Sequence, residues 1–429
     1  MNEHHTLDEW LAYLESVHHK SMDLALDRIH QVRLSLDLMP TFPIITVSGT
    51  NGKGSVCAML STILYQAGYK VGTYTSPHVL RYNERIAVNL QAADNQTIVK
   101  HLFAVDKASG NTALTIFEFL TLAAMHYFIE ASVDVAVLEV GLGGRLDAVN
   151  VFDAHAAVVT NVDLDHCDWL GNTKEAIGYE KAGIFRPGCP AIIGDKYPSQ
   201  TLLRYAKKIA ALTYIMGRDF QVEGKPDAWD FKIEQTIYRG LQIPHLQATY
   251  QMGNAALALA TLYALRTKLA VSYNAIQQGL LSVKWPWRLQ CLTGKPSLVL
   301  DVAHNPHAAL QLVKELALLS IVPRQLAVFS MLADKDIAAV LACTKKHFDA
   351  WYVAGLGVER GLSTDDLAHY FKAQNIRSVH YFDQIADAWF AALSDAAACD
   401  RIVAFGSFYT ITAVEQVRKI NHESVWFNA

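Results

Sequence analysis

The spacing of apolar residues changes near residue 43. Before that point, apolar residues recur at the intervals of a helix: Leu7, Trp10, Leu11 and Leu14. Thr6 and Glu9 open this segment at the spacing of a capping box. After residue 43, short and nearly continuous apolar runs alternate with segments of helical spacing. Buried strands separated by helices are typical of a parallel sheet that is covered on both faces.

The first half of the chain contains the clearest strand signals. Strands are expected in PIITVS (43–48), KVGTYTS (70–76), VDVAVLEV (133–140) and HAAVVTN (155–161). A helix with a stop signal at Gly68 follows the first strand, and another helix is expected near 115–130. Residues 219–250 break the alternation, and their β-prone, turn-rich sequence predicts an antiparallel edge or flap. Further helices are predicted near 251–269 and 273–282.

A second alternation follows the Pro- and Gly-containing stretch KWPWRLQCLTGKPS (284–297), which is a candidate hinge. Strands are expected in SLVLDVA (297–303), RQLAVFSML (324–332), DAWYVAGL (349–356), SVHYF (378–382) and RIVAFGS (401–407). A chain of 429 residues also exceeds what one hydrophobic core usually serves. We therefore predict two α/β domains, 1–292 and 293–429.

Composition and charge argue against several kinds of protein. The formal net charge is −4 and no basic block occurs, so nothing indicates a nucleic-acid or anionic-membrane partner. The longest apolar runs fall far short of the ~20 residues of a membrane helix. The N-terminal MNEHHTLDEW lacks the basic and apolar regions of a secretory signal. The six cysteines are scattered without C-x-x-C spacing, which indicates free thiols and a cytoplasmic protein.

The stretch SGTNGKGS (48–55) directly follows the first predicted strand. The usual phosphate-loop pattern, G-x-x-x-x-G-K-[ST], requires Gly and a hydroxyl residue where this chain has Val47 and Gly54. Even so, glycines before a helix let backbone N–H groups surround an anion at the positive end of the helix dipole. Lys53 can reach the β- and γ-phosphates, and Ser55 offers a hydroxyl to Mg²⁺. The candidate nucleotide residues here are Gly49, Asn51, Gly52, Lys53, Gly54 and Ser55.

Three other interpretations of this loop can be compared with the sequence. It could be a structural strand–helix turn with a solvated lysine, although three glycines, Lys and Ser in one such loop favour a phosphate site. A dinucleotide dehydrogenase would show G-x-G-x-x-G, which the chain lacks after its first strand. A GTPase would carry N-K-x-D, and the nearest match, NVDLD (161–165), lacks the lysine.

Six motifs in order then point to a known family. They are GTNGKGS (49–55), TSPHVLRYNERI (75–86), LEVGLGGRLDAVN (138–150), NVDLDHCDWLG (161–171), EKAGIFRPG (180–188) and DVAHNPHA (301–308). Together they resemble the folylpolyglutamate synthase and dihydrofolate synthase family, within the ATP-dependent Mur ligase superfamily. In that family GTNGKG[ST] is the normal loop. The resemblance implies an N-terminal P-loop NTPase-like parallel-sheet domain and a smaller C-terminal Rossmann-like α/β domain.

The resemblance also implies the reaction. ATP phosphorylates a substrate carboxylate, and the α-amino group of L-glutamate attacks the acyl phosphate to give an amide. The implied substrates are dihydropteroate or folates, L-glutamate and ATP, with Mg²⁺ and, as a further candidate, a monovalent cation. Such chemistry needs positioning, charge neutralisation and exclusion of water. We expect the ligase to be a monomer.

The implied metal ligands follow predicted strands. Ser76, Glu139 and His166 are expected to hold Mg²⁺, since open α/β sheets place ligands at the carboxyl ends of strands. By itself, Glu139 could instead form a salt bridge at a strand end, and a lone histidine is more often structural. Lys181 would otherwise be a surface lysine, but the resemblance implies a lysine carbamylated by CO₂, which can ligate Mg²⁺ as a carboxylate does. Burial would favour the neutral amine that this modification needs.

Other implied nucleotide residues are Asn254, Arg288 and Asp301. The family patterns around the first two, H-Q-x-x-N-A and P-G-R, are altered here at Tyr250 and Trp287. The second change puts the backbone of the hinge in question, because glycine reaches φ > 0 easily and tryptophan does so rarely. Arg288 would couple domain closure to nucleotide binding.

The remaining candidates concern the pteroate or folate substrate and glutamate. His304, as a catalytic residue beside Asn305, and Ser407 are assigned to glutamate and the closed cleft, although a turn serine fits Ser407 nearly as well. A flat pterin ring needs an apolar or aromatic wall and a few polar partners. Arg28, Phe117 and Asp147 could supply these, and Phe117 could equally be a core aromatic residue.

Two rival functions fit the sequence less well. A cell-wall Mur ligase would carry a UDP-binding domain ahead of the loop, and only 48 residues precede Gly49. A non-catalytic ATP-binding module would be expected to have lost metal or lysine positions, and all are present. A third alternative is a ligase with dihydrofolate synthase activity only, without folylpolyglutamate synthase activity.

Overall fold

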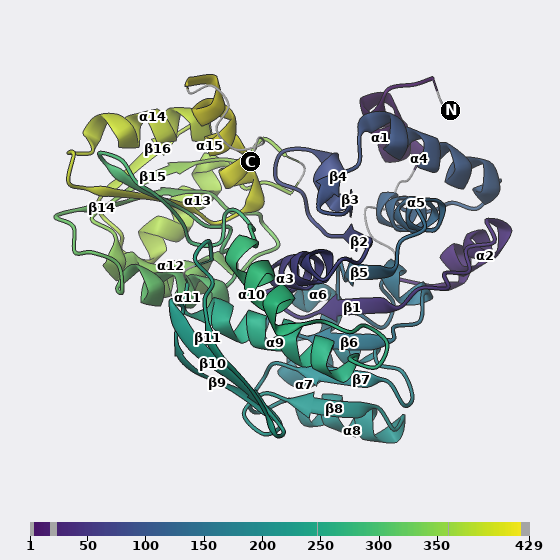
Figure 1. Ribbon diagram of the computed structural model, residues 1–429. Coiled ribbons are helices and arrows are strands. Elements are labelled where there is room, and N and C mark those ends of the chain that lie inside the picture. The colour runs from purple at the N-terminus through teal and green to yellow at the C-terminus, as the bar shows by residue number, and fades with distance from the viewer. Residues whose placement is uncertain (1–3, 18–23, 247, 359, 422–429) are drawn as a thin grey trace. The chain divides into compact units, whose positions relative to one another are not determined.

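The computed structural model describes residues 4–17, 24–246, 248–358 and 360–421. The chain divides into two compact units, of which the first ends at Lys284 and the second begins at Trp285 (Figure 1). The sequence-based boundary of 292/293 falls a little further along the chain, in the loop that follows β12 (Gln290–Leu292). Each unit has a sheet of its own.

Within the described residues, the first unit contains an eight-stranded sheet in the order β4-β3-β2-β5-β1-β6-β7-β8 (Figure 1). From β2 to β8 neighbouring strands are parallel, and β3 and β4 extend the sheet in antiparallel fashion. The strands are β1 (Ile44–Ser48), β2 (Val71–Tyr74), β3 (Ile86–Val88), β4 (Gln91–Ala92), β5 (Val135–Glu139), β6 (Ala156–Val159), β7 (Pro190–Ile193) and β8 (Leu212–Ile215). The expected parallel sheet is confirmed.

Helices cover both faces of this sheet, because successive strand residues point to opposite sides and both sets are apolar. One face packs against α3 (Lys53–Gln66) and α9 (Tyr250–Ala264), and α10 (Tyr273–Ser282) packs on α3. The other face shares one hydrophobic core with six helices. These are α1 (Leu7–Val17), α2 (Asp27–Ser35), α4 (Asn95–Ser109), α5 (Ile116–Glu130), α7 (Lys174–Ala182) and α8 (Gln200–Lys208).

The register of the parallel strands brings their carboxyl ends to one edge. Val47 in β1 aligns with Glu139 in β5 and with Val158 in β6. The segments that follow β2, β5, β1, β6 and β7 therefore leave the sheet side by side. Three of these segments contain short helices: η1 (Tyr82–Arg85) after β2, η2 (Ala148–Val151) after β5 and α6 (Cys167–Leu170) after β6.

The predicted antiparallel flap is also present. Strands β9 (Phe220–Lys225), β10 (Ala228–Ile233) and β11 (Thr236–Leu241) form an antiparallel three-stranded sheet in the described part of this unit. Its inward residues Phe220, Phe231 and Trp229 are buried.

In the described part of the second unit, a six-stranded sheet has the order β12-β13-β17-β14-β15-β16. The strands after β12 are β13 (Ser297–Leu300), β14 (Gln325–Phe329), β15 (Ala350–Ala354), β16 (Val379–Phe382) and β17 (Arg401–Phe405). The helices are α11 (Pro306–Leu316), α12 (Ile337–Thr344), η3 (Lys345–His347), α13 (Thr364–Ala373), α14 (Ile385–Asp395) and α15 (Phe408–Asn421). Only β12 is antiparallel to its neighbour among these described strands, and it lies within the stretch that is predicted as the hinge.

Local sequence patterns predict one helix cap correctly and another wrongly. The predicted capping box of α1 is confirmed, since Glu9 accepts the N–H of Thr6 at 2.7 Å. The spacing of Asn172 and Glu175 predicts a capping box for a helix that begins near Asn172; the helix is present, but this cap is wrong. Thr173 caps the helix, and the Glu175 carboxylate instead accepts the N–H groups of Gln200 and Thr201 at 3.0 and 2.7 Å, at the start of α8.

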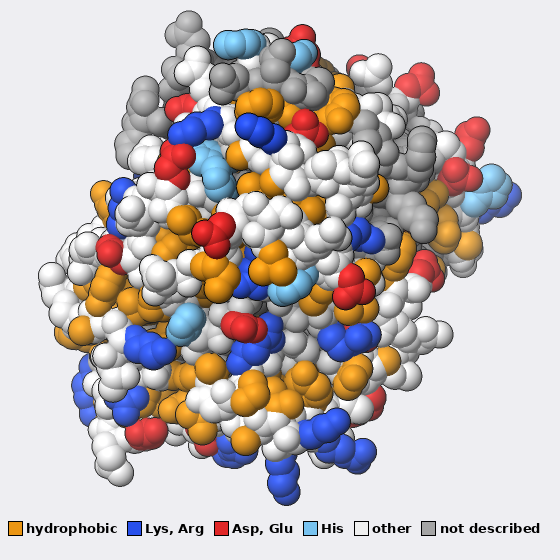
Figure 2. Space-filling model, turned by 90° about the vertical axis from the view of Figure 1, so that its right-hand side faces the viewer, with side chains coloured by type: hydrophobic (Ala, Val, Ile, Leu, Met, Phe, Trp, Pro, Cys, Tyr) orange, Lys and Arg blue, Asp and Glu red, His pale blue; other side chains and the backbone are white. Residues whose placement is uncertain are grey.

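Surface charge and cysteine chemistry follow the sequence. Acidic and basic side chains are interspersed on the face shown in Figure 2, without a large area of one sign. All six cysteines are free. Across the described ranges we find no helix with both the length and the apolar composition needed to cross a bilayer.

Candidate active site

The loop after β1 has the geometry of an anion-binding turn. Gly49 and Gly52 adopt φ values of 147° and 87°, which side-chain-bearing residues rarely reach, and α3 begins immediately at Lys53. The Lys53 Nζ donates to the carbonyl oxygens of Gly49 and Thr50 at 3.0 and 3.4 Å, so the ammonium lies over the loop. Ser55 is buried in the first turn of α3. The positive-φ glycines, the start of α3 and the nearby Lys53 ammonium together fit a nucleotide phosphate group.

Asn254 packs directly on this loop. A Cβ atom on Gly52 would lie 2.6 Å from the Asn254 Oδ1. The amide of Asn254 is held in turn by Gln251, whose Oε1 accepts from the Asn254 Nδ2 at 2.9 Å. The first turns of α9 and α3 therefore meet at the glycine, and the predicted nucleotide residues of this unit lie together.

The next strands place Ser76, Glu139 and His166 at the same edge of the sheet. Glu139 is 4% exposed at the end of β5, and its Oε2 accepts the backbone N–H of Ser76 at 3.1 Å. His166 has a φ of 52° at the start of α6, and its Nε2 lies 3.9 Å from an Asp165 oxygen. Positive φ in a non-glycine residue is costly and often marks a functional position.

Lys181 lies in the last turn of α7 and is 4% exposed. Burial, with a contribution from the positive charge of Lys53, lowers the pKa of its amine to about 7, although Asp165, Asp147 and Asp195 act in the opposite direction. The two lysines and these carboxylates therefore share one electrostatic environment. At neutral pH a large fraction of the Lys181 amine is uncharged.

Only some of the predicted metal ligands suit Mg²⁺ as unmodified side chains. Ser76 and Glu139 supply the hard oxygen atoms that Mg²⁺ prefers, whereas His166 supplies a nitrogen. No cluster of three or more His, Cys, Asp and Glu side chains suited to a metal exists in the described ranges. An oxygen ligand from Lys181 would require conversion of its amine to a carbamate.

The helix that carries Lys181 is anchored by residues that the sequence analysis missed. The Arg145 guanidinium pairs with Glu180 at 2.9 Å, and the N–H of Arg145 donates to the carbonyl of Glu180 at 2.8 Å. Asn150 donates to the carbonyl of Gly183 at 3.1 Å. GGRLDAVN and EKAG were both recognised as motifs, but only the fold shows that they bind each other.

The residues that are candidates for binding the pteroate or folate substrate also lie close together. A Cβ atom on Gly141 would lie 2.7 Å from the Phe117 ring, so this ring packs against the loop after β5. Asp147 receives the N–H of Leu142 in that loop at 2.8 Å. Burial raises the pKa of Asp147 to about 7, although backbone hydrogen bonds and Lys53 oppose the shift.

Arg28 reaches the same region from α2. Its guanidinium forms an ion pair of 3.0 Å with Glu118, the residue after Phe117. Phe117 also lies 5.8 Å from the ring of Tyr74. The three candidates therefore come from α2, α5 and the loop after β5 within a single unit.

The second unit contains Arg288, Asp301, His304 and Ser407. The Asp301 carboxylate is buried and accepts the N–H groups of Leu289 and Ala303 at 2.6 and 2.7 Å. Burial raises the pKa of Asp301, and the charge of Arg288 opposes this. Ser407 accepts the N–H of Thr410 at 2.9 Å, so its hydroxyl is engaged in the first turn of α15.

Trp287, which stands where the family pattern has glycine, adopts the backbone conformation that glycine would have. Its φ is 61°, within the region that glycine favours, and Leu289 follows with 51°. The segment is held by hydrogen bonds from the Val302 N–H to the Trp287 carbonyl at 3.1 Å and from the Leu289 N–H to Asp301. The tryptophan therefore adopts the unusual backbone conformation, and its surroundings hold it there.

Phe408 links two of these candidates and was missed. The Arg288 guanidinium carbon lies 5.4 Å from the centre of the Phe408 ring, and the His304 ring lies 5.9 Å from it. The His304 Nδ1 is 2.8 Å from the Val302 carbonyl oxygen. A carbonyl oxygen can only accept, so His304 carries a hydrogen on Nδ1. The FGSFY motif was noted for its serine, and the following aromatic residue was the available signal.

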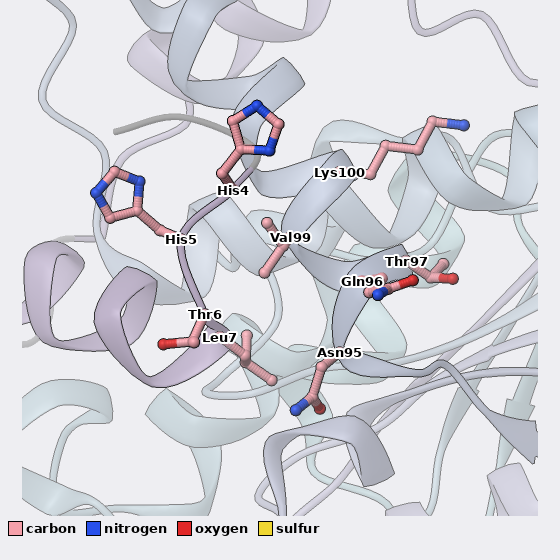
Figure 3. Close-up of a pocket in the computed structure, with 9 residues that line it drawn as sticks. All are labelled: His4, His5, Thr6, Leu7, Asn95, Gln96, Thr97, Val99 and Lys100. Atoms are coloured by element: carbon pink, nitrogen blue, oxygen red, sulfur yellow. The ribbon is translucent and has the colours of Figure 1, made fainter.

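A hollow elsewhere in the first unit does not contribute to this site. It measures about 700 Å³ and lies between residues 4–7 and the first turns of α4 (Figure 3). Figure 3 shows His4 and His5 on one side of it and Lys100 on the other. Its described lining contains none of the predicted site residues.

Comparisons with known proteins identify the family of the chain. Residues 47–262 match the model of the Mur ligase middle domain, and residues 287–408 match the Mur ligase glutamate ligase domain. The chain is 42% identical to the dihydrofolate synthase/folylpolyglutamate synthase of Escherichia coli (strain K12) over 412 residues, which cover 96% of this chain and 95% of the relative.

Solved structures are similarly close. The chain resembles E. coli FolC in complex with DHPP and ADP with a TM-score of 0.93 and 41% identity, over 98% of this chain and 99% of that one. It resembles a bifunctional folylpolyglutamate synthase/dihydrofolate synthase with Mn, AMPPNP and L-glutamate bound with a TM-score of 0.90 and 40% identity, over 97% and 99%.

Proposed function

This chain belongs to the dihydrofolate synthase and folylpolyglutamate synthase family of Mur ligases, and we propose that it ligates L-glutamate to two acceptors at the expense of ATP. One acceptor is dihydropteroate, which gives dihydrofolate, and the other is a tetrahydrofolate glutamate. The observation that carries the proposal is the common location of the Lys53 loop and the buried Lys181 at one sheet edge, in a chain with near-full-length likeness to such ligases. An acyl phosphate is the proposed intermediate.

The phosphate groups of ATP are assigned to the loop from Gly49 to Ser55. The N–H groups at the start of α3 and the Lys53 ammonium supply positive charge where the transferred phosphoryl group gains negative charge. Asn254 supports Gly52 from the side. Arg288 and Asp301 are assigned to the nucleotide from the second unit, where Asp301 holds the backbone next to Arg288.

A divalent ion would be held by Ser76, Glu139, His166 and Lys181. When bound, Mg²⁺ neutralises phosphate charge and orients the transferred group. We assign the fourth ligand to a carbamate on Lys181. Support comes from the burial of this amine and from its pKa of about 7, because carbamylation requires the uncharged form.

The acceptor is assigned to Arg28, Phe117 and Asp147. The ring of Phe117 offers an aromatic wall against the loop that contains Gly141. With a pKa of about 7, Asp147 is partly protonated at neutral pH and can donate to or accept from a pterin ring. His304 and Ser407 are assigned to glutamate. We also propose that the ligase acts as a monomer.

One alternative within this family is a ligase that uses only one acceptor. The test is phosphate release by the purified protein with ATP, Mg²⁺ and L-glutamate, measured separately with dihydropteroate and with a tetrahydrofolate. Activity with both acceptors supports the proposal. Activity with only one would reduce the protein to a single-function ligase, and activity with neither would reject the proposal.

A further inference from the structure

The loops after β1 and β6 are joined by hydrogen bonds that have no place in the roles assigned above. The N–H of Thr50 donates to the carbonyl of Asn161 at 3.0 Å, and the N–H of Asn51 donates to the Asn161 side chain at 2.9 Å. In the other direction, the Thr160 hydroxyl donates to the Asn51 carbonyl at 2.6 Å. A Cβ atom on Gly49 would lie 1.7 Å from that hydroxyl oxygen. The two loops are therefore in direct contact.

Thr50 makes an unusual two-way link within this contact. Its hydroxyl oxygen accepts the N–H of Asp163 at 3.0 Å and donates to the carbonyl of the same residue at 3.1 Å. The ladder between β1 and β6 ends with the pair Ser48 and Val159. Beyond that point, the threonine side chain satisfies the two backbone groups that a continued strand would otherwise pair.

The linked segments contain residues assigned to different parts of the reaction centre. On one side, the carbonyl of Thr50 receives the Lys53 ammonium at 3.4 Å. On the other side, Asp163 begins the turn that leads to His166, and Lys174 pairs with the Asp163 carboxylate at 3.1 Å. The N–H of Val162 is held by Asp195 at 2.8 Å. The hydroxyl of Thr50 thus connects the phosphate loop to a turn that is braced from two further elements.

We propose that Thr50 is a positioning residue that sets the distance between the nucleotide phosphate groups and the His166 side of the metal site. Mg²⁺ demands near-ideal geometry, so an ion that contacts both phosphate oxygens and protein ligands requires the two loops at a fixed separation. Loss of the hydroxyl leaves the N–H and carbonyl of Asp163 unpaired and releases the turn. The phosphate loop keeps its glycines and Lys53, so it keeps its affinity for the nucleotide itself. This inference rests on the proposed function.

The test compares Thr50→Val, which keeps the shape of the side chain without its hydroxyl, with Thr50→Ser, which keeps the hydroxyl. ADP binding is measured by titration calorimetry with and without Mg²⁺, and unfolding temperature is recorded for each protein. In Thr50→Val, we expect the gain in ADP affinity from Mg²⁺ to fall about tenfold, since an unpaired backbone group costs roughly that factor. Metal-free affinity stays within about threefold of the wild type, and Thr50→Ser behaves as the wild type does.

The matched control is Thr261→Val, which also removes a buried threonine hydroxyl, here one bonded to the Leu257 carbonyl at 2.7 Å within α9. It should leave the effect of Mg²⁺ unchanged. If Thr50→Val does not fold, Thr50→Ala carries the same prediction with less bulk in the loop.

Three results would overturn the inference: an unchanged Mg²⁺ effect in the variant without the hydroxyl, an equal loss of affinity with and without metal, or no Mg²⁺ effect in the wild type. The ligation assay on the wild type is separate. If the wild type ligates glutamate while Mg²⁺ raises the ADP affinity of Thr50→Val and Thr50→Ser equally, the role of Thr50 is rejected and the proposed function is retained.

Discussion

The side-chain oxygen of Asn254 lies 2.6 Å from the position that a Cβ atom on Gly52 would occupy. Gly52 also has a φ of 87°. Substitution by alanine would therefore strain the backbone and push Asn254 away from the phosphate loop. We expect Gly52→Ala to weaken ADP binding at least about 100-fold, measured by calorimetry.

Gly68 provides the control for backbone strain. Its φ is 91°, and a Cβ atom there would have no neighbour within 4 Å in the described structure. Gly68→Ala should lower the free energy of unfolding by about 1–2 kcal/mol and leave ADP affinity unchanged. Equal ADP affinities in the two variants would contradict the assigned role of Gly52.

The role of Lys181 predicts a large loss of turnover without a loss of fold. Lys181→Ala should lower kcat at least about 100-fold, because a metal ligand is removed. Its unfolding temperature should not fall, because a buried amine with a lowered pKa does not favour the folded state. Lys208→Ala, at an exposed lysine of α8, is the control and should retain full activity.

The carbamate itself has a separate readout. After incubation with ¹³C-bicarbonate, the wild type should show a carbamate ¹³C resonance that Lys181→Ala lacks. Added formate or acetate should restore part of the activity of the variant, because a small carboxylate can occupy the position of the carbamate. A wild-type protein without this resonance, or a variant of near-normal activity, would exclude the modification as a metal ligand.

The pair formed by the buried His101 and the half-buried His126 predicts a loss of stability in acid. Their Nδ1 atoms lie 2.6 Å apart, and burial together with the charge of His126 lowers the pKa of His101 to about 4, against an opposing effect of Glu130. The unfolded chain takes up this proton near pH 6.5. Between these values the unfolded state binds more protons, so the free energy of unfolding should decrease as the pH falls from about 6.5 to about 4.

This effect can be isolated by substitution of the titrating ring. Lys100 pairs with Glu130 beside the two histidines, and neither needs to change. His101→Gln should show a shallower decrease in the free energy of unfolding over the same pH range, measured by urea titration. Parallel curves for the variant and the wild type would show that His101 does not contribute.

Phe408 should matter for catalysis because it contacts both Arg288 and His304. Phe408→Leu should lower kcat/KM for ATP about three- to tenfold through loss of the cation–π contact and of the support for His304. Phe408→Tyr keeps the ring and should restore wild-type values. If the leucine and tyrosine variants have equal kcat/KM, the ring does not position either residue.

Much of the fold could be predicted because its core strands are continuous apolar runs. The strand β12 was missed because it is short, lies at the sheet edge and contains Pro and Gly neighbours. The cap of α7 was wrong because Glu175 binds the start of α8, a partner that local spacing cannot reveal.

In the candidate site, too, some features could be predicted from the sequence and others could not. Lys53, Glu139 and Lys181 could be proposed because each lies in a long and specific motif. The contact between Thr50 and Asp163 depends on two strands that meet in space, and the sequence does not show which residues face each other there. Trp287 could only raise a question, because whether its surroundings tolerate a φ of 61° is a property of the folded chain.

The central claim is tested most directly by the product of the wild-type protein. Purified protein is incubated with ATP, Mg²⁺, L-glutamate and either dihydropteroate or a tetrahydrofolate, and the product is followed by mass spectrometry alongside phosphate release. We predict that each acceptor gains one glutamyl residue for each phosphate released, and only when all substrates are present. Phosphate release without a glutamylated product, or no reaction with either acceptor, would contradict the account.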